Sequence, residues 1–218
     1  MLRTLLSTRK ATLLLLALVY FAGQPAFAQD PDAILDRIKT KYESVNAVQA
    51  QFTQTIASQF ADESTSSTGQ ITFQDDSYRV EVGGQTIVTD GTTTWIYDPA
   101  NNQVLINDYV QDASTFSVND FFFNFDEQYN ISSTGTGSFD GEAHVKLTLA
   151  PKAGDSLFER VILWMSESDD LVKRMEVTDV NGTEMVFQLN QIVLNPRIST
   201  DLFQFTPPTG VEVIDLRS

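Results

Sequence analysis

The feature of this sequence that most limits its fold is a long series of short segments in which apolar and polar residues alternate. In Ser77–Val82, for example, Tyr78 and Val80 fall on one face of an extended strand and Arg79 on the other. Turn-forming pairs such as Asp90-Gly91 separate these segments. Eight or more short strands at this spacing predict a single antiparallel sheet, arranged as a barrel or a sandwich.

The predicted strands cover most of the chain after residue 47. Residues 62–68 are rich in Ser and Thr and are predicted to form a turn, as is the region around Gly137. No linker composition divides the series and no repeat of 20–50 residues is evident, which favours one domain. The strands that we predict are residues 48–60, 69–74, 77–82, 85–89, 94–97, 103–106, 129–132, 144–150, 159–165, 171–178 and 183–193.

A helix is predicted just before the first strand. Asp30 has the side chain of an N-cap, and Pro31 stands in the first turn, where its missing N–H costs nothing. An apolar stripe then recurs at three- and four-residue steps, through Ile34 or Leu35, Ile38, Tyr42 and Val45.

The N-terminus has the pattern of an export signal. Basic residues at Arg3, Arg9 and Lys10 precede an apolar run over 11–22, and Ala26-Phe27-Ala28 supplies a small-x-small cleavage pattern. We therefore predict a signal peptide over 1–28 and one domain over 29–218. The alternative is a retained anchor, although the apolar run is shorter than the roughly 20 residues of a membrane span.

The chain is strongly acidic. Removal of the predicted leader, which holds three basic residues and no acidic one, takes the net charge from −15 to −18. Nucleic acids and anionic membranes both bind surfaces rich in Lys and Arg, so neither is expected as the main partner. The acidity fits a basic protein partner, and it equally fits an acidic proteome adapted to salt.

We find no candidate catalytic or metal site. The chain has no cysteine and one histidine, His144, which excludes a disulfide framework and thiol catalysis and makes a zinc or transition-metal site improbable. Strand alternation turns His144 away from the core, and we expect it to face solvent. The acidic pairs Asp75-Asp76 and Asp169-Asp170 lie in predicted turns, where solvated carboxylates are common. We therefore predict no enzymatic activity and no cofactor.

One segment departs from the strand pattern. Residues 116–125, F-S-V-N-D-F-F-F-N-F, are too apolar for a surface loop and do not alternate. Asp120 is a candidate cap for a short helix that carries Phe121–Phe123. Two interpretations remain: a plug that seals one end of the core, and a movable flap over the mouth of a cavity. Likewise, the aromatic-rich interior fits both a filled core and a ligand cavity.

Four motifs together resemble one family. Residues 87–104, I-V-T-D-G-T-T-T-W-I-Y-D-P-A-N-N-Q-V, resemble the D-G-x-x-x-W-x-Y hairpin of the periplasmic outer-membrane lipoprotein carriers, the LolA family. Phe52-Thr53-Gln54 is similar to that family's F-x-Q strand, and residues 149–152 to its L-x-P-K turn. Residues 203–213 resemble its F-x-F-x-P-P-x-G-V-x-V ending. The four motifs follow in register over essentially the whole predicted mature chain.

The resemblance implies a mainly β fold with a few helices, an incomplete (unclosed) antiparallel β-barrel covered by short α-helices. It implies a soluble periplasmic monomer that takes lipoprotein acyl chains into an apolar cavity. Its partners would be lipidated lipoproteins, an ATP-driven inner-membrane release complex and an outer-membrane acceptor. The family's cavity aromatics fall on Tyr78 and Trp95, with Val80 where an aromatic is often found, and Phe121–Phe123 fall near an apolar helical lid.

Strand alternation and the resemblance together define a set of candidate residues for a lipid cavity. They are Phe52, Ile71, Phe73, Tyr78, Val80, Ile87, Trp95, Tyr97, Phe121, Phe122 and Phe123. One departure concerns delivery, because the family commonly has Arg-Pro, tied to its lid contacts, where this chain has Gln74-Asp75-Asp76. The main alternative function is a lipid-sensing or other lipid-binding periplasmic module on the same fold. A hydrolase or a structural β-protein would need a catalytic constellation or a self-association edge, and we identify neither.

Overall fold

The computed structural model of the chain describes residues 30–58, 60, 64–109, 128–154 and 156–217. Their helices and strands follow one another along the chain. In order, they are α1 (Pro31–Glu43), β1 (Ala47–Ser58), β2 (Ser64–Gln74), β3 (Ser77–Val82), β4 (Gln85–Thr89), β5 (Thr93–Asp98), β6 (Gln103–Asp108), β7 (Tyr129–Phe139), β8 (Glu142–Pro151), β9 (Phe158–Ser166), β10 (Val172–Asp179), β11 (Thr183–Leu194), the 3₁₀ helix η1 (Thr200–Phe203) and β12 (Glu212–Asp215).

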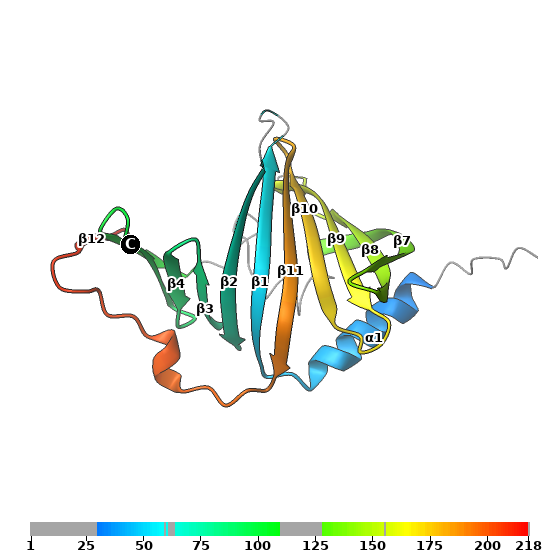
Figure 1. Ribbon diagram of the computed structural model, residues 1–218, viewed down its shortest axis with the longest axis horizontal. Coiled ribbons are helices and arrows are strands. Elements are labelled where there is room, and N and C mark those ends of the chain that lie inside the picture. The colour runs from blue at the N-terminus through cyan, green and yellow to red at the C-terminus, as the bar shows by residue number, and fades with distance from the viewer. Residues whose placement is uncertain (1–29, 59, 61–63, 110–127, 155, 218) are drawn as a thin grey trace, which may run out of the picture.

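All the described strands belong to one curved sheet that does not close. The twelve strands are ordered β12-β6-β5-β4-β3-β2-β1-β11-β10-β9-β8-β7, so that β12 and β7 form the two edges (Figure 1). The predicted mainly β, unclosed architecture is confirmed. One pair departs from the antiparallel pattern, because β12 runs parallel to β6. The face of the sheet that carries the side chain of Phe52 is called the inner face, and the opposite one is called the outer face.

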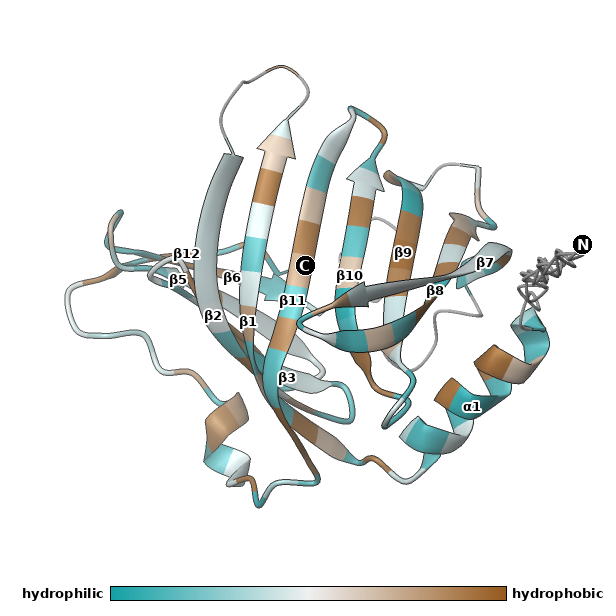
Figure 2. Ribbon diagram, turned by 45° about the vertical axis from the view of Figure 1, so that its right-hand side comes forward, coloured by the Kyte–Doolittle hydropathy of each residue, from teal (hydrophilic) through white to brown (hydrophobic). Residues whose placement is uncertain are grey.

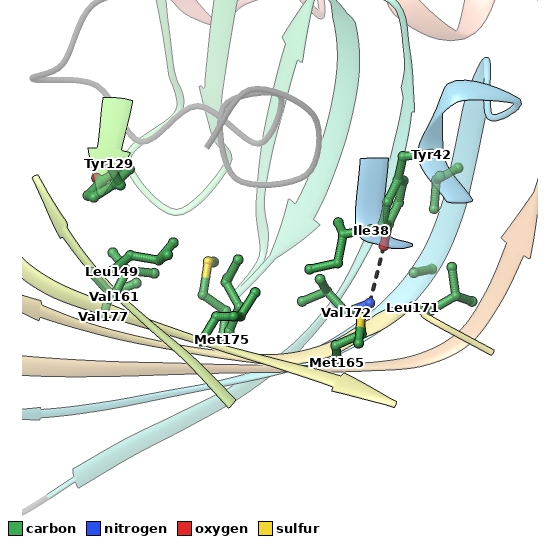
Figure 3. Close-up of a cluster of buried hydrophobic side chains, with 14 of the residues drawn as sticks. Ile38, Tyr42, Tyr129, Leu149, Val161, Met165, Leu171, Val172, Met175 and Val177 are labelled. Carbon is green, nitrogen blue, oxygen red and sulfur yellow. Dashed lines mark hydrogen bonds between the residues drawn. The ribbon is translucent and has the colours of Figure 1, made fainter. Parts of the chain in front are cut away.

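The predicted helix is present and starts where its capping residue indicates. The Asp32 backbone N–H donates a hydrogen bond to Asp30 Oδ1 at 3.1 Å, and Pro31 opens the first turn. Ile38 and Tyr42 are buried against the inner face beside Leu171 and Val172 (Figure 3). The Tyr42 hydroxyl accepts a hydrogen bond from the Val172 N–H at 3.3 Å, and burial raises the pKa of Tyr42. The helix therefore closes one end of the inner face.

Two predicted turns are parts of strands. Residues 64–68 pair with β1 as the first half of β2, because an extended Ser/Thr segment satisfies its backbone groups as well in a ladder as in a turn. β7 continues to Phe139 instead of ending at Ser132, and Gly137 pairs with His144 inside the ladder. Both differences lengthen hairpins beyond what local alternation indicates.

The expectation that His144 faces solvent is wrong. Alternation does place it on the outer face, but only 1% of its surface is exposed. The β7–β8 hairpin bends back across this face (Figure 2), and the Phe139 ring stacks on the imidazole with 4.0 Å between ring centroids. At the hairpin tip, Asp140 accepts a hydrogen bond from Gln188 Nε2 of β11 at 2.7 Å. The hairpin thus covers the outer face over β9 and β10.

None of the helices in the described ranges is long and apolar enough to cross a membrane. The predicted leader, residues 1–28, lies outside those ranges.

Two glycines of β7, Gly135 and Gly137, have different surroundings on the outer face. Substitution of each should therefore change the stability of the protein by a different amount. A Cβ at Gly137 would meet Trp164 Cζ3 at 2.7 Å, whereas a Cβ at Gly135 would meet nothing within 4 Å. We expect Gly137→Ala to lower the free energy of unfolding by about 1–3 kcal/mol, as overpacking does. Gly135→Ala should be neutral within about 0.5 kcal/mol. Urea denaturation measures both, and equal effects would contradict this packing.

Candidate functional site

An apolar cavity of about 210 Å³ lies on the inner face, in the middle of the sheet. Its walls are supplied by six strands that are neighbours in the sheet, in the order β4-β3-β2-β1-β11-β10. The lining residues are Phe52, Gln54, Ile71, Tyr78, Val80, Val82, Ile87, Val172, Arg174, Met175, Phe187 and Leu189.

Cross-strand pairing brings these side chains together. Ile71 pairs with Val80, and Val80 pairs with Ile87, so that one apolar row crosses β2, β3 and β4. On the other side, Phe52 pairs with Leu189 across β1 and β11. Directly paired residues share a face of the sheet, which is why residues distant in sequence form one wall.

The position of the Phe52 ring requires a glycine in the neighbouring strand. A Cβ at Gly69, which pairs with Phe52, would meet Phe52 Cζ at 2.6 Å and the Glu81 carbonyl oxygen at 2.5 Å. The aromatic ring therefore lies over the position that a larger side chain would fill. On its other side, the Phe52 ring is inclined to that of Phe187, with 6.5 Å between centroids. Gly69 thus lets an aromatic side chain lie against the sheet at the cavity floor.

Polar groups in the wall are few. Burial raises the pKa of Tyr78 to about 12, with a smaller contribution from Tyr109, so that the phenol is neutral at physiological pH. The guanidinium of Arg174 lies on the outer face, where it is 5.3 Å from the Trp164 ring and donates to Glu176 at 2.9 Å. The cavity therefore presents hydrocarbon, a neutral phenol and the amide of Gln54. Such a surface suits an apolar ligand.

Five of the predicted cavity residues are brought together at this site. Phe52, Ile71, Tyr78, Val80 and Ile87 line the cavity. Phe73 is on the same face but 3% exposed, within the packed core beside the cavity. Phe121, Phe122 and Phe123 lie outside the described residues. That any of these side chains contacts lipid stays a prediction.

Trp95 and Tyr97 do not line the cavity, and their placement there needs correction. Trp95 pairs with Val88 and Tyr97 with Thr86, whereas it is Ile87, between those two, that points into the cavity. Both aromatic side chains therefore lie on the outer face. There, the Tyr97 ring is 5.7 Å from the ring of Phe205, which belongs to the segment that follows η1. On that face Trp95 pairs with Val88 and Tyr97 pairs with Val104, and the side chains of both valines are fully buried.

The far wall of the cavity is not among the residues predicted from the sequence. Met175 pairs with Phe187, and Phe187 pairs with Gln54, which joins the C-terminal half of the chain to β1. Alternation within residues 171–178 and within residues 183–193 indicates which side chains of each strand share a face. It could not show that β11 pairs with β1. The missed lining residues are Gln54, Val82, Val172, Arg174, Met175, Phe187 and Leu189.

In the part of the chain that the structure describes, no three His, Cys, Asp or Glu side chains gather as metal ligands. His144, on the outer face, holds its Nδ1 3.0 Å from the Glu142 carbonyl oxygen, and its buried Nε2 has no hydrogen-bond partner there. The chemistry of the described site is therefore that of an apolar hollow in an unclosed β-barrel.

Comparison with known proteins identifies the family of this chain. The family model of the outer membrane lipoprotein carrier protein LolA matches residues 43–206, and the chain belongs to that family. The outer-membrane lipoprotein carrier protein of Dechloromonas aromatica is 30% identical over 184 residues, which cover 83% of this chain and 86% of the relative. That of Halorhodospira halophila is 25% identical over 214 residues, 95% of each chain.

A solved structure shares the fold. The crystal structure of an uncharacterized conserved protein from Thermus thermophilus superposes with a TM-score of 0.54, covering 84% of this chain and 98% of its own. Its sequence identity is 15%, so the likeness concerns the fold alone.

The contact between Phe52 and Gly69 predicts that this glycine cannot be enlarged. In Gly69→Ala, the new methyl would meet backbone as well as the ring, so the ring must move towards Phe187 or the strands must separate. We expect a loss of about 1–3 kcal/mol in the free energy of unfolding. Denaturation followed by circular dichroism measures it. The double variant Gly69→Ala/Phe52→Leu should cost less than the sum of its single changes, and strict additivity would contradict the contact.

Proposed function

We propose that this protein is a periplasmic carrier that holds the acyl chains of lipoproteins in the apolar cavity and shuttles them from the inner to the outer membrane. The observation that carries the proposal is a cavity walled by six strands and lined almost wholly by hydrocarbon, in a chain of the lipoprotein carrier family. The proposal includes export through a leader at 1–28 and folding of 29–218 as one domain.

The energetics of acyl binding suit a carrier that must release its cargo. Burial of a methylene contributes about 0.8 kcal/mol, so one fully buried chain of about 16 carbons would contribute on the order of 12 kcal/mol. Two such chains would exceed the practical limit of non-covalent affinity. Partial burial keeps the complex reversible. The cavity of about 210 Å³ is smaller than the roughly 300–1,000 Å³ of typical ligand pockets, which fits the burial of part of one chain.

The proposed partners follow from the same energetics. Transfer out of a bilayer is unfavourable, so loading requires an ATP-driven complex in the inner membrane. Unloading requires only an outer-membrane acceptor with a more apolar site. The carrier works as a monomer and needs neither a cofactor nor nucleic acid.

A release assay tests this function. The purified protein is added to energised inner-membrane vesicles that hold its cognate release complex and a lipidated lipoprotein, and the supernatant is examined for soluble cargo. We expect cargo in equimolar amount with the carrier. Absence of cargo, with the carrier shown to be folded, would contradict the shuttle and favour a lipid sensor.

Filling the cavity should block binding without unfolding the protein. Val80 lines the cavity, whereas Val193, on the outer face of β11, is 48% exposed. We expect Val80→Trp to weaken binding of a fluorescent acyl probe at least tenfold, because the indole occupies the space of the chain. Val193→Trp, the same substitution on the other face, should leave binding unchanged. Equal affinity of both variants would show that the probe binds elsewhere.

A further inference from the structure

Exposure along the inner face of β1 rises from one end of the strand to the other. Val48, Ala50 and Phe52 are 4%, 2% and 7% exposed, whereas Ile56 is 36% exposed. Gln54, which is half-buried, lies between Phe52 and Ile56 on this face. It therefore marks the boundary between the sealed part of the inner face and its open end.

Gln54 brings a primary amide into a wall that is otherwise nearly all hydrocarbon. Within the described ranges its side chain makes no hydrogen bond. Its cross-strand neighbours on the same face are Phe187 of β11 and Ser67 of β2, another half-buried polar side chain. A polar group beside apolar surface is stabilised by a ligand that offers it a partner.

The other polar group in the cavity lies towards the opposite end. Tyr78 pairs with Phe73, which in turn pairs with Val48 at the sealed end of β1. Between Tyr78 and the Gln54–Ser67 pair lie Ile71, Val80 and Val82, all apolar. The cavity therefore has a polar group near each end, and an acyl chain with one polar end could bind in either orientation. One orientation is favoured only if one end of the cavity is more exposed to solvent than the other. The gradient along β1 supplies that difference, because Val48 at one end of the strand is 4% exposed and Ile56, beyond Gln54 at the other end, is 36% exposed.

We propose that Gln54, with Ser67 across the ladder, holds the carbonyl group at the head of an acyl chain, whose methyl end points inward past Phe52. The inference rests on the proposed function and adds to it a recognised chemical group and a direction. The Gln54 amide donates through Nε2–H to the ester or amide carbonyl, and the Ser67 hydroxyl offers a second donor. Both links between an acyl chain and a lipoprotein, ester and amide, carry such a carbonyl.

The test compares two lipids that differ only at this group. A short-chain diacyl phosphatidylcholine and its dialkyl ether analogue each displace a fluorescent acyl probe from the purified protein. We expect the diester to bind about fivefold more tightly, the effect of one net hydrogen bond. In Gln54→Met, which keeps the length of the side chain, the ratio should fall to about one while the affinity for the diether is retained. Gln51→Met, on the exposed outer face of the same strand, should keep the ratio of the unaltered protein.

Each other outcome is informative. A ratio of one in the unaltered protein, or a ratio that survives in Gln54→Met, would overturn the proposal. Loss of the ratio in Tyr78→Phe but not in Gln54→Met would place the carbonyl at the sealed end and overturn it too. Failure of the unaltered protein to bind either lipid would contradict the proposed function itself, and this inference with it. Circular dichroism of each variant confirms that a lost ratio is not lost folding.

Discussion

The pairing of β1 with β11 is the constraint on which the rest of the structure depends. It runs from Val48 opposite Leu194 to Ser58 opposite Thr183 and joins the N-terminal strands β2–β6 to the C-terminal strands β7–β10. Without this ladder the chain would hold two smaller sheets. With it, one curved surface results, and the middle of that surface, where the two halves meet, is the place where the cavity lies.

The apolar side chains of the two faces of the sheet are covered in different ways. On the outer face, the β7–β8 hairpin and the segment after η1 cover Trp164 and Tyr97 with parts of the same chain. On the inner face, within the described residues, α1 packs over Leu171 and Val172 at one end. Among the described residues, the apolar middle is lined but unfilled. The proposed carrier function needs such a surface, because the cargo would complete the core and then leave it.

Local pattern predicts much of this architecture and little of its assembly. Alternation identified Phe52, Val80 and Ile87 because a strand's period of two is a local property. It could not decide which apolar face of β5 meets the cavity, since Trp95 and Ile96 suit either side, and the resemblance favoured the wrong one. Nor could it reveal Phe187 as a wall of the site, because the partner of β11 lies more than a hundred residues away in the sequence. The burial of His144 likewise depends on a hairpin that folds over a distant strand.

The central claim is that lipoprotein acyl chains occupy the inner face of the sheet. Site-specific photocrosslinking in living cells tests it directly, with a diazirine-bearing aliphatic residue placed at Leu189 in the cavity or at Val193 on the outer face of the same strand. The account predicts lipoprotein adducts from Leu189 and none from Val193. Adducts of equal yield at both positions, or at Val193 alone, would contradict it.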